Sequence, residues 1–105
     1  LLTCLSNDYG YENWIEKALS FYADNGDLVI CISSSGQSKN IINGAKFAKK
    51  IGCKVVTLTG FNKDNKVRKI GHINLWLDSK NYNLVEMTHH IWLLAIVDFM
   101  AKAKY

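Results

Sequence analysis

Serines dominate one short segment of the chain. Between an apolar run and the start of a helical pattern lie, in order, Ser33, Ser34, Ser35, Gly36, Gln37 and Ser38. Serine hydroxyls are rotatable hydrogen-bond donors, and the first N–H groups of a helix are unpaired at the positive end of its dipole. Gly36 lets the main chain approach a ligand closely. This segment, called the serine loop below, therefore predicts a phosphate-binding site.

The residues of this segment do not match three better-known types of loop at a helix start. A plain helix N-cap needs one serine, whereas four of the six residues here are serines. The segment lacks the Gly-Lys-[Ser/Thr] ending of a Walker loop and the Gly-x-Gly-x-x-Gly pattern of a dinucleotide site. We therefore expect a phosphate cradle that belongs to neither class.

A second group of residues that could perform chemistry lies near the C-terminus. Glu86 is followed three and four residues later by His89 and His90, so either pair can meet on a helix surface. A carboxylate and an imidazole could serve as base and acid or hold a metal. They could also be an ordinary helix pair, with the carboxylate near the positive end of the dipole. We take Glu86 and His89 as the catalytic candidates, predict no metal site, and expect His72 to be structural.

The elements that must position these residues alternate along the chain. Helical spacing predicts helices over 12–23, 40–51 and 84–103, with a short one at 67–70, and apolar runs predict strands over 28–32, 55–58 and 73–77. Such alternation predicts an α/β fold, a three-layer αβα open parallel sheet with right-handed crossovers. Ligands of such sheets bind beyond the carboxyl ends of the strands, which would bring together 33–38, 59–61 and 78–82.

Apolar positions predict which side of each helix is buried. Residues of the first helix expected on one side are Trp14, Ala18, Leu19 and Tyr22, and those of the second expected inside are Ile41, Ile42, Ala45, Ala48 and Ile51, with Gly52 ending the helix. The last helix is apolar on nearly all its faces. We expect it to be buried on all sides, partly by another subunit.

Composition excludes several classes of protein. The chain has 105 residues, enough for one domain, with a formal net charge of +4 that suits an anionic small substrate. Its lysines are dispersed and lack aromatic stacking platforms, so no nucleic-acid partner is expected. The longest apolar run, 91–100, is too short for a bilayer, so no membrane partner is expected. Cys4, Cys31 and Cys53 are expected to be buried free thiols of a cytoplasmic protein.

Three segments of the sequence resemble the SIS (sugar isomerase) domain family, most closely phosphoheptose isomerases. The segment 26–38 is similar to the strand and serine loop of all SIS domains, and 54–60 to their second strand and turn. Residues 2–11 include Asn7-Asp8-Tyr9-Gly10-Tyr11, which points more narrowly to the heptose enzyme. The resemblance spans almost the whole chain.

The resemblance implies a fold, an activity and partners. It implies the SIS fold, flavodoxin-like, lacking its N-terminal helices and first strand, so that 1–105 is a single domain forming the C-terminal part of a longer family chain. The activity implied is isomerisation of sedoheptulose 7-phosphate to heptose 7-phosphate, a step toward lipopolysaccharide. Substrate contacts would come from Asp8 and from the family's phosphate positions Ser33, Ser34, Ser35 and Ser38. The expected assembly is a cytoplasmic homotetramer with active sites between subunits.

The chain also departs from the family pattern. The family's catalytic glutamate, and the zinc-ligand histidine of its metal-dependent members, precede the part present here, so zinc is expected at most in a full-length enzyme. Where the last helix of the family carries glutamine and a catalytic histidine, this chain has Glu86 and Leu94; His89 matches a histidine that is not catalytic. Two alternatives therefore stay open: a non-catalytic sugar-phosphate-binding or protein-interaction module, and an isomerase of another phosphosugar.

Overall fold

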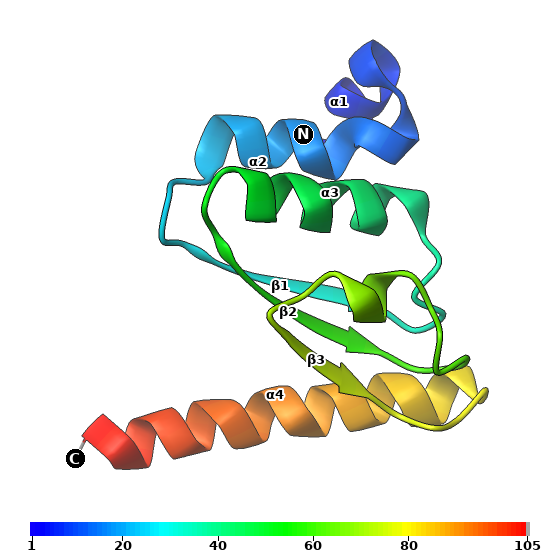
Figure 1. Ribbon diagram of the computed structural model, residues 1–105, viewed down its shortest axis with the longest axis vertical. Coiled ribbons are helices and arrows are strands. Elements are labelled where there is room, and N and C mark those ends of the chain that lie inside the picture. The colour runs from blue at the N-terminus through cyan, green and yellow to red at the C-terminus, as the bar shows by residue number, and fades with distance from the viewer. Residues whose placement is uncertain (105) are drawn as a thin grey trace.

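The chain forms helices on both faces of a small sheet, as Figure 1 shows. The computed structural model describes residues 1–104. In chain order the elements are α1 (Leu2–Tyr9), the 3₁₀ turn η1 (Tyr11–Asn13), α2 (Trp14–Tyr22), β1 (Leu28–Ser33), α3 (Lys39–Lys50), β2 (Lys54–Thr59), the 3₁₀ turn η2 (Val67–Lys69), β3 (Ile73–Trp76) and α4 (Tyr82–Lys104). All predicted helices and strands are present, with ends shifted by a few residues.

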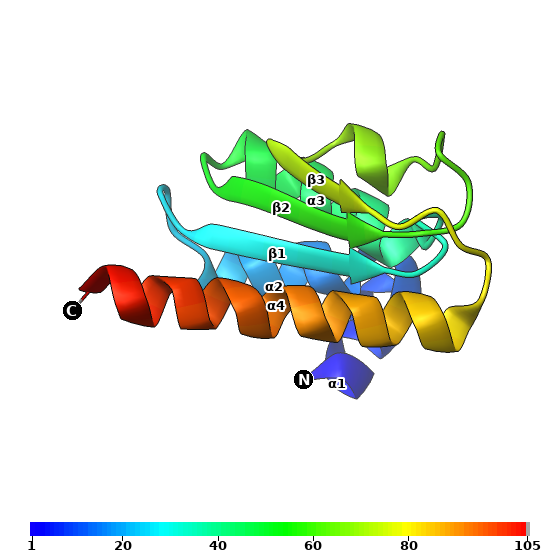
Figure 2. The same cartoon turned by 90° about the horizontal axis from the view of Figure 1, so that it is seen from below.

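The sheet has three parallel strands in the order β1-β2-β3. Leu28 pairs with Lys54 at the start of the first ladder, and Val56 pairs with Ile73 at the start of the second. One face is covered by α3, with α2 beside it, and α4 runs along the opposite face (Figures 1 and 2). The predicted three-layer α/β architecture is confirmed.

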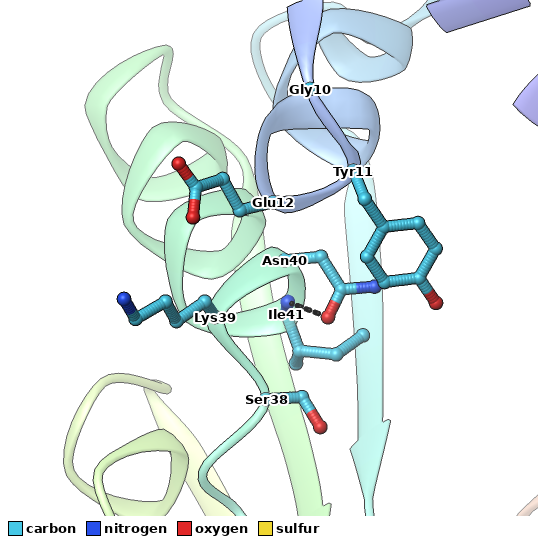
Figure 3. A pocket seen from close by; sticks show the side chains of 7 residues that line it. All are labelled: Gly10, Tyr11, Glu12, Ser38, Lys39, Asn40 and Ile41. Carbon is cyan, nitrogen blue, oxygen red and sulfur yellow. Dashed lines mark hydrogen bonds between the residues drawn. The ribbon is translucent and has the colours of Figure 1, made fainter. Parts of the chain in front are cut away.

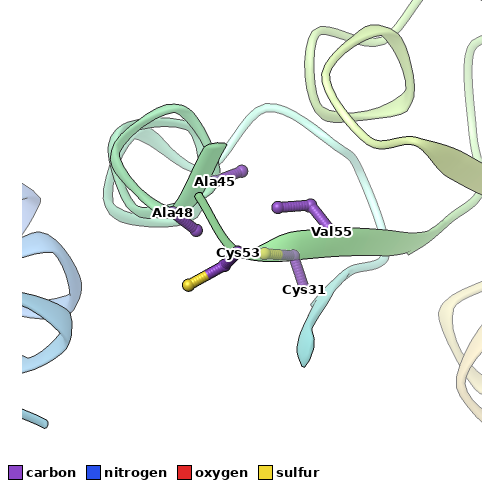
Figure 4. Packing of buried hydrophobic residues seen from close by; sticks show 5 residues of the cluster. All are labelled: Cys31, Ala45, Ala48, Cys53 and Val55. Carbon is purple, nitrogen blue, oxygen red and sulfur yellow. The ribbon is translucent and has the colours of Figure 1, made fainter. Parts of the chain in front are cut away.

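Small side chains allow α3 to lie close to the sheet. The core between them consists of Cys31, Ala45, Ala48, Cys53 and Val55, which come from α3, β1, β2 and the turn before β2 (Figure 4). Alanines at spacing three share one helix face, and their lack of bulk lets the helix backbone approach the strands. The predicted inward face of α3 is therefore confirmed, and so is its end at Gly52, whose φ is +91°.

Strand β1 is less buried than its sequence suggests. A continuous apolar run predicts a strand buried on both faces, yet Leu28, Ile30 and Ile32 are 61%, 42% and 46% exposed. These three side chains share the α4 side of the sheet, because they alternate with Val29 and Cys31, which pack into the core. The prediction was wrong for this face because, within residues 1–104, α4 packs against β2 and leaves the side chains of β1 on that face exposed.

Helix α4 is also largely exposed, which corrects the expectation that it is buried on all sides. Val85 and His89 are its buried residues within the described chain. Its exposed large apolar side chains are Tyr82, Leu84, Met87, Ile91, Leu94, Ile96, Val97, Phe99 and Met100. The apolar character of this helix is therefore not explained by packing within residues 1–104.

By length and composition alone, α4 could cross a membrane. Its mean hydropathy reaches 1.3 within residues 82–103, and 11% of that stretch is buried. This corrects the expectation that no apolar segment is long enough to cross a bilayer, since the few charged residues of α4 leave the helix apolar on average. Core helices of soluble proteins can have the same length and composition, so these two properties alone do not place α4 in a membrane.

Three smaller differences concern the N-terminal part and one cysteine. Helix α1 was not predicted; Leu5 is its buried residue, so its sequence carries little periodic apolar signal. Tyr22 was expected on the buried side of α2 but is exposed. Cys4 was expected to be buried but is exposed on α1, where its Sγ lies 3.7 Å from Oδ2 of Asp8.

The environments of the cysteines predict a difference in thiol reactivity. Burial raises the pKa of the Cys31 thiol, which lowers its thiolate fraction at neutral pH. We expect a maleimide to label Cys4 at least about tenfold faster than Cys31 in the folded chain, with equal rates in denaturant. Mass spectrometry after timed labelling measures this difference. Equal rates in the folded chain would contradict the packing of β1 against α3.

Candidate functional site

The serine loop folds back on itself through its own side chains. The N–H of Gly36 donates to Oγ of Ser33 at 3.1 Å and to the carbonyl oxygen of Ser33 at 3.2 Å. Oγ of Ser33 also lies 3.3 Å from Oγ of Ser38, and the N–H of Gln37 donates to Oγ of Ser35 at 3.3 Å. Gly36 has a φ of +68°, which closes the turn. These bonds give the loop a defined shape.

The positive end of α3 opens onto this loop. Ser38 is the N-cap residue of α3, but its hydroxyl makes no capping bond to the helix N–H groups. The hydroxyl is directed instead to Ser33, across the loop. The N–H of Ile41 donates to Oδ1 of Asn40 at 3.0 Å, so the serine hydroxyls lie beside the helix N–H groups of Lys39 and Asn40, which have no acceptor within residues 1–104.

The three loops at the carboxyl edge of the sheet come together as predicted. The N–H of Gly60, after β2, donates to the carbonyl oxygen of Ser34 at 2.9 Å. The N–H of Phe61 donates to the carbonyl oxygen of Ser79, in the loop before α4, at 2.8 Å. The loop after β2 thus joins the serine loop to the start of α4.

Asn65 is a central residue of this edge that sequence reasoning missed. Its side chain is fully buried, and its Nδ2 donates to Oγ1 of Thr59 at 3.1 Å and to the carbonyl oxygens of Gly60 at 3.1 Å and Asn62 at 3.0 Å. Its Oδ1 accepts the N–H of Arg68 at 2.8 Å. Asparagine is frequent in turns, so the sequence showed a loop but not these partners.

The same side chain touches the serine loop directly. A Cβ built on Gly36 would overlap Oδ1 and Cγ of Asn65, so the two residues are in van der Waals contact across Cα of Gly36. One more bond joins the two segments, because the N–H of Val67 donates to the carbonyl oxygen of Gly36 at 3.0 Å. Glycine at this position is therefore required by the neighbour as well as by the turn.

An aromatic pair lies at the carboxyl edge of the sheet, at the start of α4. The rings of Phe61 and Tyr82 lie 4.6 Å apart between centroids, tilted by 60°. Phe61 has a φ of +59°, which is rare for a residue other than glycine and common near functional sites. The pair connects the loop after β2 to the first turn of α4.

A hollow of about 620 Å³ lies beside the end of the serine loop, between η1 and the first turn of α3. Its polar lining includes Tyr11 and Asn40 on one side and Glu12 and Lys39 on the other, with Ser38 at its end (Figure 3). This volume would admit a small ligand. The hollow reaches from Ser38 of the serine loop to Gly10, the residue that follows the helix containing Asp8.

Asp8, predicted to contact the substrate, lies apart from the serine loop in this structure. Its carboxylate is exposed on α1 and accepts a weak bond from the thiol of Cys4. Within residues 1–104 no hydrogen bond joins it to Ser33–Ser38. Its predicted contact with a substrate stays a prediction.

The two catalytic candidates occupy different environments on α4. Glu86 is exposed, whereas His89 is 2% exposed and its Nε2 lies 2.9 Å from the carbonyl oxygen of Thr59. A carbonyl oxygen only accepts, so Nε2 must carry the proton of this bond. His89 therefore ties α4 to the end of β2, and the predicted catalytic roles of Glu86 and His89 stay predictions. His72 is structural as expected, since its Nδ1 accepts the N–H of Val55 at 3.0 Å.

The described residues do not form a metal centre. Within residues 1–104 no group of three or more His, Cys, Asp and Glu side chains lies close enough to hold an ion. A zinc ion therefore does not fit the residues present in this part of the fold, and no chemical step is assigned to one.

The comparison with protein families shows to which family the chain belongs. A family model described as SIS domain matches residues 1–60, more than half of the chain. The chain belongs to the SIS domain family. The matched stretch contains the serine loop and the segment around Asp8, which carried the resemblance in sequence.

Several relatives of this SIS domain are named phosphoheptose isomerase. That of Aliarcobacter butzleri is 39% identical over 88 residues, which cover 84% of this chain and 46% of the relative. That of Glaesserella parasuis is 35% identical over 107 residues, covering 96% of this chain and 55% of the relative. The chain thus spans about half the length of the curated relatives it matches.

Solved structures of such enzymes share its fold. The phosphoheptose isomerase from Neisseria gonorrhoeae has a TM-score of 0.85 and 26% sequence identity, covering 92% of this chain and 55% of the other. The enzyme from Francisella tularensis has the same TM-score of 0.85 with 24% identity, covering 52% of that chain. The described strands and helices therefore form part of an SIS fold.

The contact between Gly36 and Asn65 predicts an unusually costly glycine substitution. Gly36→Ala would place a methyl group in the left-handed region, which costs about 1–2 kcal/mol, and against Asn65. Gly26→Ala is the matched control, since Gly26 has a φ of +92° but nothing within 4 Å of its built Cβ. We expect Gly36→Ala to lower the free energy of unfolding in urea by at least about 1 kcal/mol more than Gly26→Ala. Equal losses would show that the contact is unimportant.

Proposed function

We propose that this SIS domain is the phosphate-binding part of a sugar-phosphate isomerase that converts sedoheptulose 7-phosphate to heptose 7-phosphate. The observation that carries the proposal is the serine loop, whose hydroxyls lie at the N-terminus of α3, where Ser38 makes no capping bond to the helix. Relatives named phosphoheptose isomerase support the substrate class. The phosphate would be bound by Ser33, Ser34, Ser35 and Ser38, with the main chain of Gly36 and Gln37.

Phosphate binding would supply orientation rather than the chemical step itself. Aldose–ketose isomerisation moves a proton between adjacent carbons through an enediol, with a base at the C–H bond and an acid at the carbonyl oxygen. Binding energy from a phosphate remote from these carbons holds them against the catalytic groups. The serine loop would therefore lower the barrier by fixing the position of the sugar.

Proton transfer is assigned to Glu86 among the residues present. Its carboxylate is exposed in the second turn of α4, and the start of this helix is tied to the carboxyl edge by the bond of His89 to Thr59. We assign His89 the part of holding this helix in place. We also assign Asp8, on α1, a contact with the sugar, as the family resemblance implies.

The proposed site needs residues beyond this chain, which spans about half of its relatives. The second acid or base would come from another part of the protein or from another subunit. The exposed apolar side chains of α4 and β1 support an assembly, which we propose to be a homotetramer with active sites between subunits. The enzyme would act in the cytoplasm, in the synthesis of lipopolysaccharide.

A ligand titration tests the phosphate site. At about 100 times its dissociation constant, sedoheptulose 7-phosphate should stabilise the folded chain by roughly 2.7 kcal/mol. Inorganic phosphate should stabilise it less, and unphosphorylated sedoheptulose not at all, because the charge is what the loop binds. Thermal unfolding measures the three shifts.

Two serine variants sharpen this experiment. The hydroxyl of Ser34 makes no hydrogen bond within the described residues, so Ser34→Ala should reduce the ligand shift while leaving the unliganded protein as stable as before. Ser20→Ala is the control, because Ser20 lies on α2 and bonds to the carbonyl oxygen of Lys17. A full shift in Ser34→Ala, or no shift by any phosphorylated sugar in the unaltered chain, would count against the site.

Kinetics of the enzyme test Glu86. In the full-length protein, Glu86→Gln should lower kcat by about 10²–10⁴, the usual range for one acid–base group, with little change in phosphate affinity. His90→Gln is the control, since His90 is an exposed neighbour on the same helix. An unchanged kcat in Glu86→Gln would remove this residue from the mechanism.

A second function is favoured by one observation. Leu94 is an exposed apolar residue at the position where the family resemblance places a catalytic histidine. The domain would then be a non-catalytic module that binds a sugar phosphate or another protein. Isomerase activity gained by Leu94→His would support an altered enzyme, whereas ligand binding without turnover in both proteins would support the module.

A further inference from the structure

We propose that Asn65 is a positioning residue of the serine loop, whose carboxamide fixes the main chain of Gly36 and Gly60 so that the loop is shaped for an oxyanion before the ligand arrives. The inference rests on the proposed function of that loop. Asn65 does not belong to the loop in sequence, since β2 and α3 lie between them.

Asn65 reaches the serine loop from two sides. On one side its Oδ1 and Cγ touch Gly36, whose carbonyl oxygen is bonded to the N–H of Val67 at 3.0 Å. On the other side its Nδ2 donates to the carbonyl oxygen of Gly60, whose own N–H donates to the carbonyl oxygen of Ser34 at 2.9 Å. A displacement of this side chain would therefore move both ends of the Ser34–Gly36 turn.

The partners of Asn65 specify an amide at this position. The two hydrogens of Nδ2 are shared among Thr59, Gly60 and Asn62 at 3.0–3.1 Å, and Oδ1 accepts the N–H of Arg68 at 2.8 Å. Aspartate offers the acceptor but no donor when ionised, and an apolar residue offers neither. Because the side chain is 0% exposed, water would not replace a lost bond at low cost.

A fixed loop would favour anion binding by removing an ordering cost. Hydroxyl and N–H donors that already point at the ligand lose little conformational freedom on binding. The serine side chains close the turn of the loop through their own hydrogen bonds, but they do not fix the turn to the rest of the edge. Asn65 supplies that attachment through buried main-chain bonds, without contacting the ligand.

Sulfate binding by two aspartate variants tests the inference, because sulfate keeps its charge over the pH range used. Asn65→Asp removes the donors at constant shape. Asn62→Asp adds the same charge to the same loop, where Asn62 is exposed and its side chain has no hydrogen bond within residues 1–104. At about pH 8 we expect sulfate affinity to fall at least about tenfold in Asn65→Asp and by no more than about threefold in Asn62→Asp.

A pH dependence separates positioning from a general loss of structure. A buried aspartate at position 65 has its pKa raised by desolvation, and its protonated form regains one donor. Sulfate affinity of Asn65→Asp should therefore recover at about pH 5.5 relative to the other two proteins. The ionisable groups around it are common to all three proteins: Lys63, Asp64, Lys66 and Arg68 on its own segment and His89 beyond Thr59. Equal affinities of the two variants would overturn the inference.

Amide hydrogen exchange in the unaltered chain without ligand gives a second measurement that does not depend on a variant folding. The N–H groups of Gly60 and Val67 and the side-chain N–H groups of Asn65 should exchange at least about 100-fold slower than exposed loop amides. Rapid exchange would overturn the inference even if sulfate binds. Protection without any sulfate binding would support Asn65 and reject the proposed function of the loop.

Discussion

The close approach of Asn65 to Gly36 is the contact on which the carboxyl edge of the sheet depends. A loop built from serines and glycine has no apolar side chains to anchor it, and beyond Ser33 its main-chain groups lie outside the ladders of the sheet. The buried amide compensates for both deficits, because it packs against Gly36 and satisfies the carbonyl oxygen of Gly60. A site for an anion thus follows from ordinary hydrogen-bond satisfaction in the interior.

Most of the fold could be predicted because its signals are local. The alanines of α3 and the apolar runs of the strands report their own element through spacing alone. Burial could not be predicted in the same way: Leu28, Ile30 and Ile32 have the composition of a central strand, but β1 is an edge strand in residues 1–104. Helix α1 was missed because Leu5 is its buried residue and leaves little periodicity to detect.

The same distinction between local and long-range signals applies to the residues of the candidate site. The serine loop was predictable, since its residue types, its preceding strand and its following helix are contiguous in sequence. Asn65 was not, since its role depends on partners in two other segments that meet only after folding. His89 is an intermediate case: its position on α4 was predictable, but its bond to the carbonyl oxygen of Thr59 was not, and that bond is what separates it from the exposed Glu86.

The proposed assembly would account both for the exposed apolar surface of α4 and for the open edge of β1. The helix begins against the sheet, where Val85 packs on Gly60 and His89 bonds to Thr59, and its apolar surface continues onto the exposed side chains of β1. Within the described residues β1 pairs only with β2, so its other edge presents unpaired N–H and C=O groups. Lipid cannot satisfy such groups, whereas a protein segment can, by adding a strand or covering the edge. A cover that suits both the helix and the strand edge must therefore bring hydrogen-bonding groups as well as apolar ones.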